Sequence, residues 1–487
     1  MLDFRKAKNM KIKIVLIALL VGLFSSCGKY LELKPKNTLV VNSMEEARLM
    51  MSSYLASMTQ NATYQVSFNG RKLSWPFNRD IMANFVFYGD DVNMMTVLSN
   101  AYSKKYEVEY YEDKDWKGQQ LSKTIWNQLY SHIGYLTAVI NEGEKFKDQK
   151  NYAMVMGEAL TIRAYFIFKL QQYFAPLDKA ELGIPLNLDL DEFRNVPRWQ
   201  QKDIYAQIIK DLEKALSLGG YDAQWNVFHT ADISKFILSQ VYAYKAATVA
   251  KESTDWEYVA KYTDELGQRT SLEATAAEFT AEFRPLATGY VKNNPHSLLT
   301  IGWLGSPRNN LSSLWGVGTS RMKPNPELLA LYSATDIRKK SFFDASNNFN
   351  KFDFLFFKVE DYQLLFRLAD TYLLNIEADW KTGKTAEAKR KLAGFIQQRT
   401  GENKVIADAD FERSLYNERR KELCAELDAR WIDLKRNRVA FQREATLDNG
   451  QGKEMYKLEA NDYRYTLPIP EESELNYNSK IAQNPGW

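Results

Sequence analysis

The helical periodicity of the apolar residues is the feature that most constrains the fold of this chain. Between residues 203 and 218, apolar side chains recur at intervals of three and four, which places them along one face of a helix. Gly219 and Gly220 follow directly and predict the end of this helix. The residues of the stripe are Ile204, Ile208, Leu212, Ala215 and Leu216. The pattern predicts a helix over residues 203–218 with one buried face.

Other stretches show that helices come in close pairs. Residues 151–174 are apolar on nearly every side of a helix, which predicts a helix buried between two neighbours. Antiparallel helix pairs joined by short turns build tetratricopeptide-type repeats, although the strict repeat consensus is absent here. We therefore expect an all-α fold of stacked helix pairs. Further helices are expected over residues 44–58, 122–146, 233–250, 256–266, 361–381, 385–400 and 410–438.

Two long stretches between the helices lack this periodicity. Residues 60–120 are rich in Asn, Asp, Tyr and Gly, and residues 284–355 carry many aromatic residues. Loops of this length in a compact protein are usually functional or disordered, and a high aromatic content argues against disorder. No low-complexity run or hinge-like linker separates them. We expect one compact domain over residues 27–487 whose long loops carry the function.

The first 26 residues have the pattern of a secretory signal peptide. Five basic residues precede an apolar run at residues 14–24, and Ser25 and Ser26 are small residues at a cleavage point. Eleven apolar residues span only about 16 Å as a helix, too little to cross a bilayer. The segment LFSSC, which ends in Cys27, resembles a bacterial lipobox. We expect cleavage after residue 26 and lipid attachment to Cys27.

The charge balance argues against a nucleic-acid partner. The chain has a formal net charge of +3, and residues 1–26 hold five basic residues and one Asp. Without that segment the net charge is −1, so the basic excess belongs to the expected signal peptide. We expect no binding of nucleic acid.

The cysteines and histidines predict a fold without disulfides or a metal. With Cys27 lipidated, Cys424 has no partner for a disulfide within the chain. The three histidines are widely spaced, in no pattern typical of a zinc or copper site. Asp90 and Asp91 are adjacent carboxylates, but they lack the spacing of a calcium loop. We expect no cofactor and no metal.

Signatures of catalysis are also missing. The sequence contains no G-x-S-x-G motif, no P-loop and no dinucleotide-binding G-x-G-x-x-G after a strand. Glu418 and Glu422 lie four residues apart, on one face of an expected helix. They have the spacing of a general acid and base, but carboxylates with arginines around them are more often a structural ion network. We expect that the protein is not an enzyme.

The residue types in the irregular stretches suit an uncharged, hydroxyl-rich ligand. Aromatic rings offer flat apolar surfaces to sugar C–H groups, and planar polar side chains bond to hydroxyls. Both types occur together in two stretches, at residues 75–91 and 303–321. An alternative is that these tryptophans pack the loops onto the core. The candidate ligand-binding residues are Trp75, Asn78, Arg79, Tyr88, Asp90, Trp303, Trp315 and Arg321.

Near the C-terminus, NERRKEL at residues 417–423 is followed by RWIDLKR at 430–436. This pair is the most specific of several segments, in order along the chain, that resemble the SusD/RagB family of outer-membrane nutrient-binding lipoproteins of Bacteroidetes. Residues 426–430 (ELDAR) depart from the Glu-Gly-x-Arg of many members, so the resemblance does not predict the conformation of the turn at this place. The other matching segments are YLELKP at 30–35, GEALTIRAYF at 157–166, GIPL at 183–186, VPR at 196–198, IIKDLEKA at 208–215, LPIP at 467–470 and QNPGW at 483–487.

This resemblance implies a tetratricopeptide-like right-handed superhelical scaffold, with an N-terminal family segment over residues 27–230 and a C-terminal one over 280–487. It implies that loops in roughly the two aromatic stretches form the ligand face. It further implies a lipid-anchored protein at the cell surface that binds an oligosaccharide and passes it to a SusC-like TonB-dependent transporter. Two alternatives remain open: a helix-repeat scaffold whose only partner is the transporter, and a peptide-binding, RagB-like lid.

Overall fold

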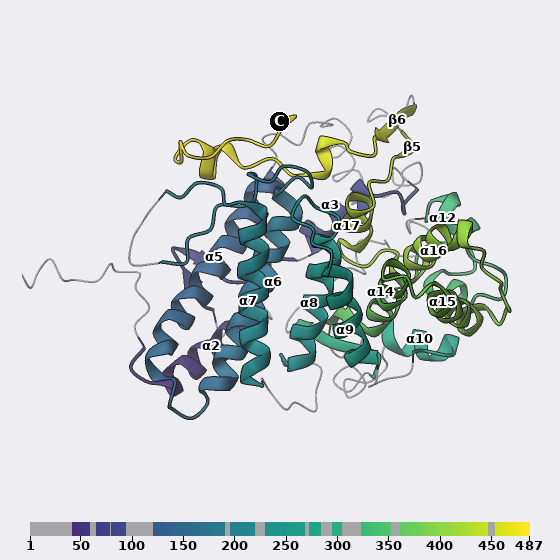
Figure 1. Ribbon diagram of the computed structural model, residues 1–487. Helices are drawn as coiled ribbons and strands as arrows, with labels where there is room; N and C mark the ends of the chain where they lie inside the picture. Colours follow the sequence, from purple (N-terminus) through teal and green to yellow (C-terminus); the bar gives the residue numbers. More distant parts are fainter. Residues whose placement is uncertain are drawn as a thin grey trace, which may run out of the picture. The chain divides into compact units, whose positions relative to one another are not determined.

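Helices make up most of the computed structural model (Figure 1). In the part of the chain that it describes, strands form only three two-stranded sheets, so the expected all-α architecture of helix pairs is confirmed. None of the described helices is long and apolar enough to cross a membrane. The structure describes residues 41–58, 65–77, 79–93, 120–189, 195–219, 229–267, 272–283, 295–303, 323–351, 361–446 and 453–487.

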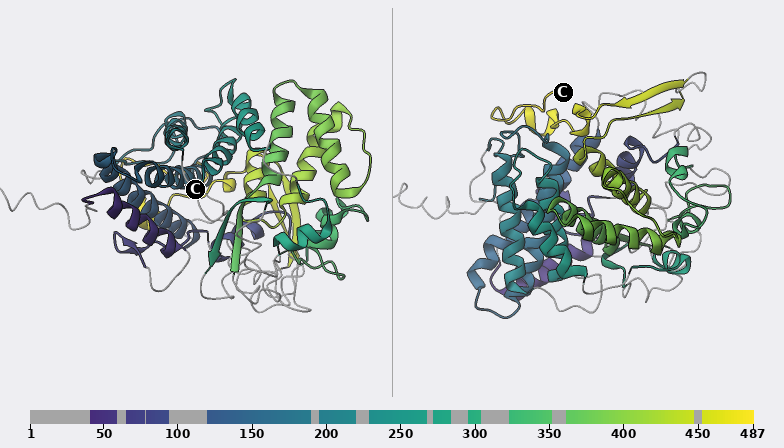
Figure 2. Two further views of the ribbon diagram at one scale, coloured as in Figure 1. Left: turned by 90° about the horizontal axis from the view of Figure 1, so that it is seen from below. Right: turned by 45° about the vertical axis from the view of Figure 1, so that its right-hand side comes forward.

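Helices that follow one another in the chain pack side by side. In the amino-terminal half, α5 packs on α6, α6 on α7 and α7 on α8, and the series continues through α9 to α14 and α15 (Figures 1 and 2). Sequential packing of this kind is the arrangement of tetratricopeptide-like proteins. The elements of the series are α2 (Met44–Met58), α5 (Gln120–Gly143), η2 (Glu144–Phe146), α6 (Tyr152–Phe174), α7 (Gln201–Leu218), α8 (Ala231–Lys245), α9 (Asp255–Gly267), α14 (Leu368–Lys381) and α15 (Thr385–Thr400).

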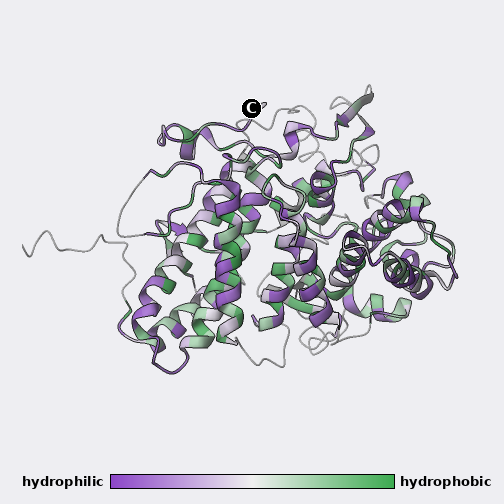
Figure 3. Cartoon of the chain, viewed as in Figure 1, coloured by the Kyte–Doolittle hydropathy of each residue, from purple (hydrophilic) through white to green (hydrophobic). Residues whose placement is uncertain are grey.

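Helices α6 and α7 bury the faces that the sequence predicts. Helix α6 is buried on nearly all sides between α5, α7 and α8, as expected for a helix without a polar face. Helix α7 buries Ile204, Ile208 and Leu212 and turns its polar residues outward, so both hydropathy colours run along it in Figure 3. Gly219 has a φ of 85°, the left-handed conformation that ends the helix.

Three of the predicted helices are wrong in their extent. The first part of 361–381 is strand β4 (Asp361–Arg367), because it pairs with β3 (Ser297–Trp303), so long-range pairing overrides the local helical pattern (Figure 2). The stretch 233–250 is helical only as far as Lys245. The stretch 410–438 is interrupted between α16 (Phe411–Leu423) and α17 (Ala429–Arg436).

The interruption falls where the sequence departs from the family pattern. Ala425 and Leu427 have φ values of 62° and 48°, a left-handed conformation that disfavours residues with a Cβ atom and ends a helix. The family often has a glycine near this position, and this chain adopts the turn without one. After the turn α17 still contacts α16, and Arg419 of α16 donates to the Asp433 carboxylate of α17 at 3.1 Å.

Helices also occur inside the stretches that lack periodicity. Helix α12 begins with Asn325, whose side chain accepts a hydrogen bond from the backbone of Glu327, and Pro326 stands at its first position. A capping residue and a proline at the first position mark the start of a helix, but the periodicity of apolar residues does not reveal them. The remaining elements are β1 (Ser67–Phe68), β2 (Arg71–Lys72), α3 (Arg79–Tyr88), α10 (Ala276–Phe283), α12 (Pro326–Ala330), α13 (Ile337–Phe342), η7 (Asp408–Asp410), β5 (Phe441–Thr446), β6 (Lys453–Leu458), η8 (Tyr463–Tyr465) and η9 (Glu471–Leu475).

Candidate functional site

The structure brings together the ends of the two stretches that hold the candidate ligand residues. We call residues 90–93 and 323–325 the loop stem. The backbone N–H of Asn93 donates to the carbonyl of Lys323 at 2.9 Å, and that of Asn325 donates to the carbonyl of Asp91 at 2.7 Å. The Asn325 side chain donates to the carbonyl of Asp90 at 3.0 Å. Segment 94–119 therefore begins, and segment 304–322 ends, at one hydrogen-bonded stem.

Two arginines of the carboxy-terminal motif hold the loop stem. Arg430 on α17 donates to both carboxylate oxygens of Asp90, at 2.6 and 2.7 Å. Arg420 on α16 donates to the Asp91 carboxylate at 2.9 Å and to the Asp90 carbonyl at 2.8 Å. Paired donors to one carboxylate fix its orientation as well as its distance. The stem is thus attached rigidly to α16 and α17.

The charges of the stem follow from burial and from these arginines. Burial favours the neutral form of Asp90, but Arg430 and Arg420 outweigh it and lower the pKa of Asp90 to about 2. Burial raises the pKa of Asp91 above its ordinary value, against the effect of Arg420. The Asp90 carboxylate forms an ion pair with Arg430, and the Asp91 carboxylate forms one with Arg420.

Tyr88 and Trp75, both candidate ligand residues, have partners inside the protein. Tyr88 is 1 % exposed, and its ring lies 5.8 Å from that of Trp431 on α17. Trp75 is 3 % exposed, and its ring packs edge-on against Phe77 and lies 6.2 Å from the ring of Phe166 on α6. Their burial favours the alternative that these rings, like the Asp90 carboxylate, hold the loop bases to the core.

The other candidates lie wholly or partly outside the described residues. Arg79 begins α3 and Trp303 ends β3, but the described part of the chain does not include their side chains. Asn78, Trp315 and Arg321 lie outside it altogether, as does Cys27. Their assignment to ligand binding or to lipid attachment stays a prediction.

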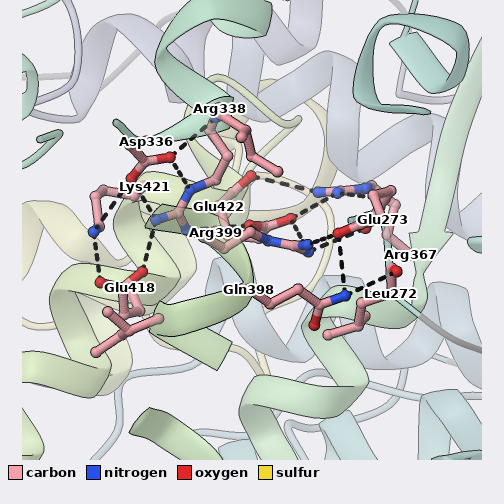
Figure 4. Close-up of polar contacts among 12 residues, drawn as sticks. Leu272, Glu273, Asp336, Arg338, Arg367, Gln398, Arg399, Glu418, Lys421 and Glu422 are labelled. Carbon is pink, nitrogen blue, oxygen red and sulfur yellow. Dashed lines mark hydrogen bonds and ion pairs between the residues drawn. The ribbon is translucent and has the colours of Figure 1, made fainter. Parts of the chain in front are cut away.

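Glu422 lies at the centre of an ion network between helices (Figure 4). Its side chain is fully buried, and three arginines donate to it: Arg367 at 2.8 Å, Arg399 at 3.1 Å and Arg338 at 3.2 Å. Burial alone would raise the pKa of Glu422, but these arginines hold it well below its usual range. Glu418, one turn earlier, accepts from Arg338 at 2.8 Å.

The network connects elements that are far apart in the sequence. Arg338 belongs to α13, Arg367 to β4 and Arg399 to α15, and all three converge on α16. Glu273 and Glu282, before and within α10, bind Arg367 from the other side. These carboxylates are buried and each is paired with arginines, so the arrangement is a structural ion network. This is the interpretation that the sequence favoured for Glu418 and Glu422.

A cavity of about 100 Å³ lies between α6, α8 and the α16–α17 turn. The charged groups along it pair with one another: Lys169 with Asp428 at 2.8 Å, and Arg419 with Asp370 at 2.7 Å.

The loop-stem partners Arg420 and Arg430 were not predicted as site residues, although both stand in the motif that the sequence identified. Their pairing with residues 330 and 340 positions away has no local signal.

Family models match both halves of the chain. A model described as starch-binding associating with outer membrane matches residues 29–229, and the SusD family model matches residues 357–487. No curated protein matches the chain by sequence.

Solved structures of low sequence identity share the fold. A SusD superfamily protein from Bacteroides fragilis matches with a TM-score of 0.70 and 20% identity, over 91% of this chain and 100% of its own. A SusD-like carbohydrate binding protein from Bacteroides vulgatus gives 0.66 and 18%, over 91% and 98%. A SusD superfamily protein from Bacteroides thetaiotaomicron gives 0.66 and 19%, over 91% and 100%. With family models that match residues 29–229 and 357–487, and a shared fold over 91% of the chain, this chain belongs to the SusD/RagB family.

Proposed function

We propose that this protein is a cell-surface lipoprotein of the outer membrane that binds an oligosaccharide and delivers it to a TonB-dependent, SusC-like transporter. Its part is equilibrium binding without chemistry. The family models support a carbohydrate ligand and an association with the outer membrane. For an uncharged oligosaccharide on aromatic platforms we expect a Kd on the order of 10⁻⁴ to 10⁻⁶ M.

The loop stem is the observation that carries this proposal. It ties residues 90–93 to residues 323–325, so segment 94–119 begins, and segment 304–322 ends, at one place on the scaffold. A ligand face needs its aromatic and planar polar residues to converge on a rigid base. The arginine pairs of Asp90 and Asp91 supply that rigidity.

The buried carboxylates support binding without catalysis. A general acid or base must reach its substrate within hydrogen-bond distance. Glu422 is fully buried and bonds to three arginines, and the Glu418 side chain is 6% exposed and bonds to Arg338. Turnover of any glycan by the purified protein would contradict this part of the proposal.

Calorimetry against a panel of plant, host and microbial glycans is the direct test. We expect one class of glycan to bind, and Trp303→Ala and Trp315→Ala to weaken its binding at least tenfold without lowering Tm. Tyr477→Ala is the matched control, because Tyr477 is 73% exposed and lies on the C-terminal segment. Unchanged glycan binding in both tryptophan variants would overturn the assignment of these loops.

Delivery is tested by co-purification with the transporter from the native membrane. Loss of glycan binding with retained transporter binding, in the same tryptophan variants, supports capture and delivery. The reverse outcome supports the scaffold alternative, and retention of peptides in place of glycans supports a peptide-binding lid. For the lipid anchor, incorporation of labelled palmitate in the wild type and its loss in Cys27→Ser is the expected result.

A further inference from the structure

A second cavity lies where α6 ends, and it shares no lining residue with the loop stem. Its volume is about 210 Å³. The C-terminal segment closes one side of it, because the backbone of Leu467 donates to the carbonyl of Tyr173 at 2.8 Å. Its walls are residues 176–179, Lys435, Arg438, residues 460–463, 465–466 and 484–485.

Lys435 brings a buried cation to this cavity. The side chain is 2% exposed, and its ammonium donates to the carbonyls of Gln172 at 2.6 Å and Ala175 at 2.9 Å. An ammonium has three N–H donors, so one remains after these two bonds. Among the described residues no carboxylate forms an ion pair with Lys435. A buried charge without a counter-charge is costly, and an anion in the cavity would remove that cost.

The other charges around the cavity also favour an anion. Arg438 donates to the Asn461 side chain at 2.6 Å, and within the described part of the chain it has no carboxylate partner. The Asp462 carboxylate is occupied, because Arg464 donates to both of its oxygens at 2.8 and 2.7 Å. Asp178 is an exposed residue of the wall. Arg438 and, in its protonated form, Lys435 therefore face the cavity with donors to spare.

An aromatic ring stands at the same place. Tyr463 lines the cavity and is 41% exposed, and its ring is held edge-on at 4.9 Å from the ring of Trp487. An exposed ring of fixed orientation offers a face to the C–H groups of a sugar. The volume lies below the roughly 300–1,000 Å³ of pockets for larger ligands, so it suits one sugar ring better than a chain.

We propose that this cavity is a second binding site, which takes an acidic sugar unit of the uronate type. The guanidinium of Arg438 and the free N–H of Lys435 bind the carboxylate, and Tyr463 contacts the ring. A planar guanidinium matches a carboxylate in two parallel hydrogen bonds, which favours a carboxylate over other anions. The site lies outside the two aromatic stretches and does not depend on the ligand that they bind.

Binding at this site is linked to a proton. Burial lowers the pKa of Lys435 to about 7, so in the free protein near neutral pH a substantial fraction of its amine is uncharged. A carboxylate beside it favours the charged form, so binding takes up a proton and weakens as the pH rises above 7. The other titratable or charged groups that face the cavity are Asp178, Lys179, Arg438, Asp462, Tyr463 and Tyr465.

The test is calorimetry on the full chain with glucuronate, glucose, acetate and inorganic phosphate as probes. We expect glucuronate to bind with proton uptake at pH 7.5, acetate to bind at least tenfold more weakly, and glucose not to compete. Arg438→Gln should weaken glucuronate at least tenfold and keep the proton uptake, whereas Lys435→Met should abolish both. Arg413→Gln is the matched control, since the Arg413 side chain is 75% exposed on α16.

Several outcomes would overturn the proposal. Glucose binding as tightly as glucuronate would exclude a carboxylate site, and acetate binding as tightly would exclude a contact with the ring. Phosphate binding more tightly than glucuronate would exclude the carboxylate preference. Unchanged affinity in Arg438→Gln, a half-exposed position whose substitution should leave the fold intact, would exclude the site itself even if Lys435→Met fails to fold. Retained glucuronate binding in Trp303→Ala separates this site from the loops.

Discussion

Helices α6 and α16 are both largely buried, but they are buried by opposite means. Helix α6 buries apolar and aromatic side chains on nearly all sides, such as Phe166, Ile167 and Leu170. Helix α16 buries five consecutive charged residues, 418 to 422. Apolar burial is favourable without regard to direction, whereas a buried charge is tolerated only where a partner meets it. The two helices are therefore held in place largely by different forces.

This difference also shows in how each helix contacts its neighbours. Each charge of α16 reaches another element: Glu418 reaches α13, Arg419 reaches α14 and Arg420 reaches the loop stem. Directional pairs fix the angle and register of these elements as well as their proximity. Helix α6 contacts the stretch before the loop stem through apolar rings, such as Phe166 against Trp75, and α16 contacts the stem itself through the directional bond of Arg420 to Asp91.

The strongest test of this contrast is the removal of Glu422. In Glu422→Ala three buried guanidinium groups lose a shared carboxylate, and we expect a loss of about 4 kcal/mol in the free energy of unfolding. Chemical denaturation at pH 7 measures it. Glu412→Ala is the control, since the Glu412 side chain is 64% exposed in its pair with Lys381, and its effect should lie within error. Equal effects of the two substitutions would contradict a structural network.

The matching test on α6 is Leu170→Ala. Leu170 is fully buried, so its truncation leaves an apolar void, and we expect a loss of about 3 kcal/mol. Leu49→Ala on α2 is the control, because Leu49 is 52% exposed. Glycan affinity should be unchanged in Leu170→Ala at temperatures where the variant is folded. A loss of affinity there would show that α6 also determines the geometry of the ligand face.

The same contrast separates what the sequence predicted from what it did not. The limits of α2 and α15, and nearly those of α6 and α7, follow from hydropathy periodicity, because these helices are buried by apolar faces. The sequence favoured an ion network around Glu418 and Glu422, but not its partners Arg338, Arg367 and Arg399, since pairing over such separations depends on the folded backbone. For the same reason the stretch that forms β4 was predicted as helix.

Among the candidate ligand residues, local composition did not distinguish the support of a loop from its tip. Trp75, Tyr88 and Asp90 stand in a stretch with the right mixture of aromatic and polar residues, yet each is buried against another element. Only the tertiary contact with Arg430 identifies Asp90 as part of a support. The resemblance to the family therefore predicts the region of the ligand face but not the individual residues that bind the ligand.

Asp90→Asn tests whether the network of the carboxy-terminal motif governs the loop stem. The amide keeps the shape of the side chain but removes the charge that two arginines face, and we expect a loss of about 2 kcal/mol at pH 7 together with weaker glycan binding. Because the pKa of Asp90 is lowered to about 2, its contribution is complete above about pH 5 and disappears as the pH falls toward 2. The deficit of the variant should therefore shrink at pH 3.

Asp408→Asn is the control for that variant, because the Asp408 side chain is 70% exposed in its pair with Lys389. Reduced stability of Asp90→Asn with unchanged glycan affinity would show that the loop stem is a structural joint with no influence on the ligand face.

Lys435 on α17 gives the smallest and most specific effect, because it is a buried cation whose contacts are carbonyls and not carboxylates. Its pKa in the folded state is about 7, below the ordinary value, so between pH 7 and 9 the unfolded chain binds more protons than the folded one. Stability should therefore rise with pH in this window, by up to about 1.4 kcal/mol per pH unit from this group. In Lys435→Met that part of the slope should vanish, while Lys384→Met, on a side chain that is 55% exposed, should keep it. A slope of equal size in the wild type and in Lys435→Met would mean that Lys435 stays charged in the folded wild-type protein, as it would beside a bound anion, and α17 would then follow the same rule as α16.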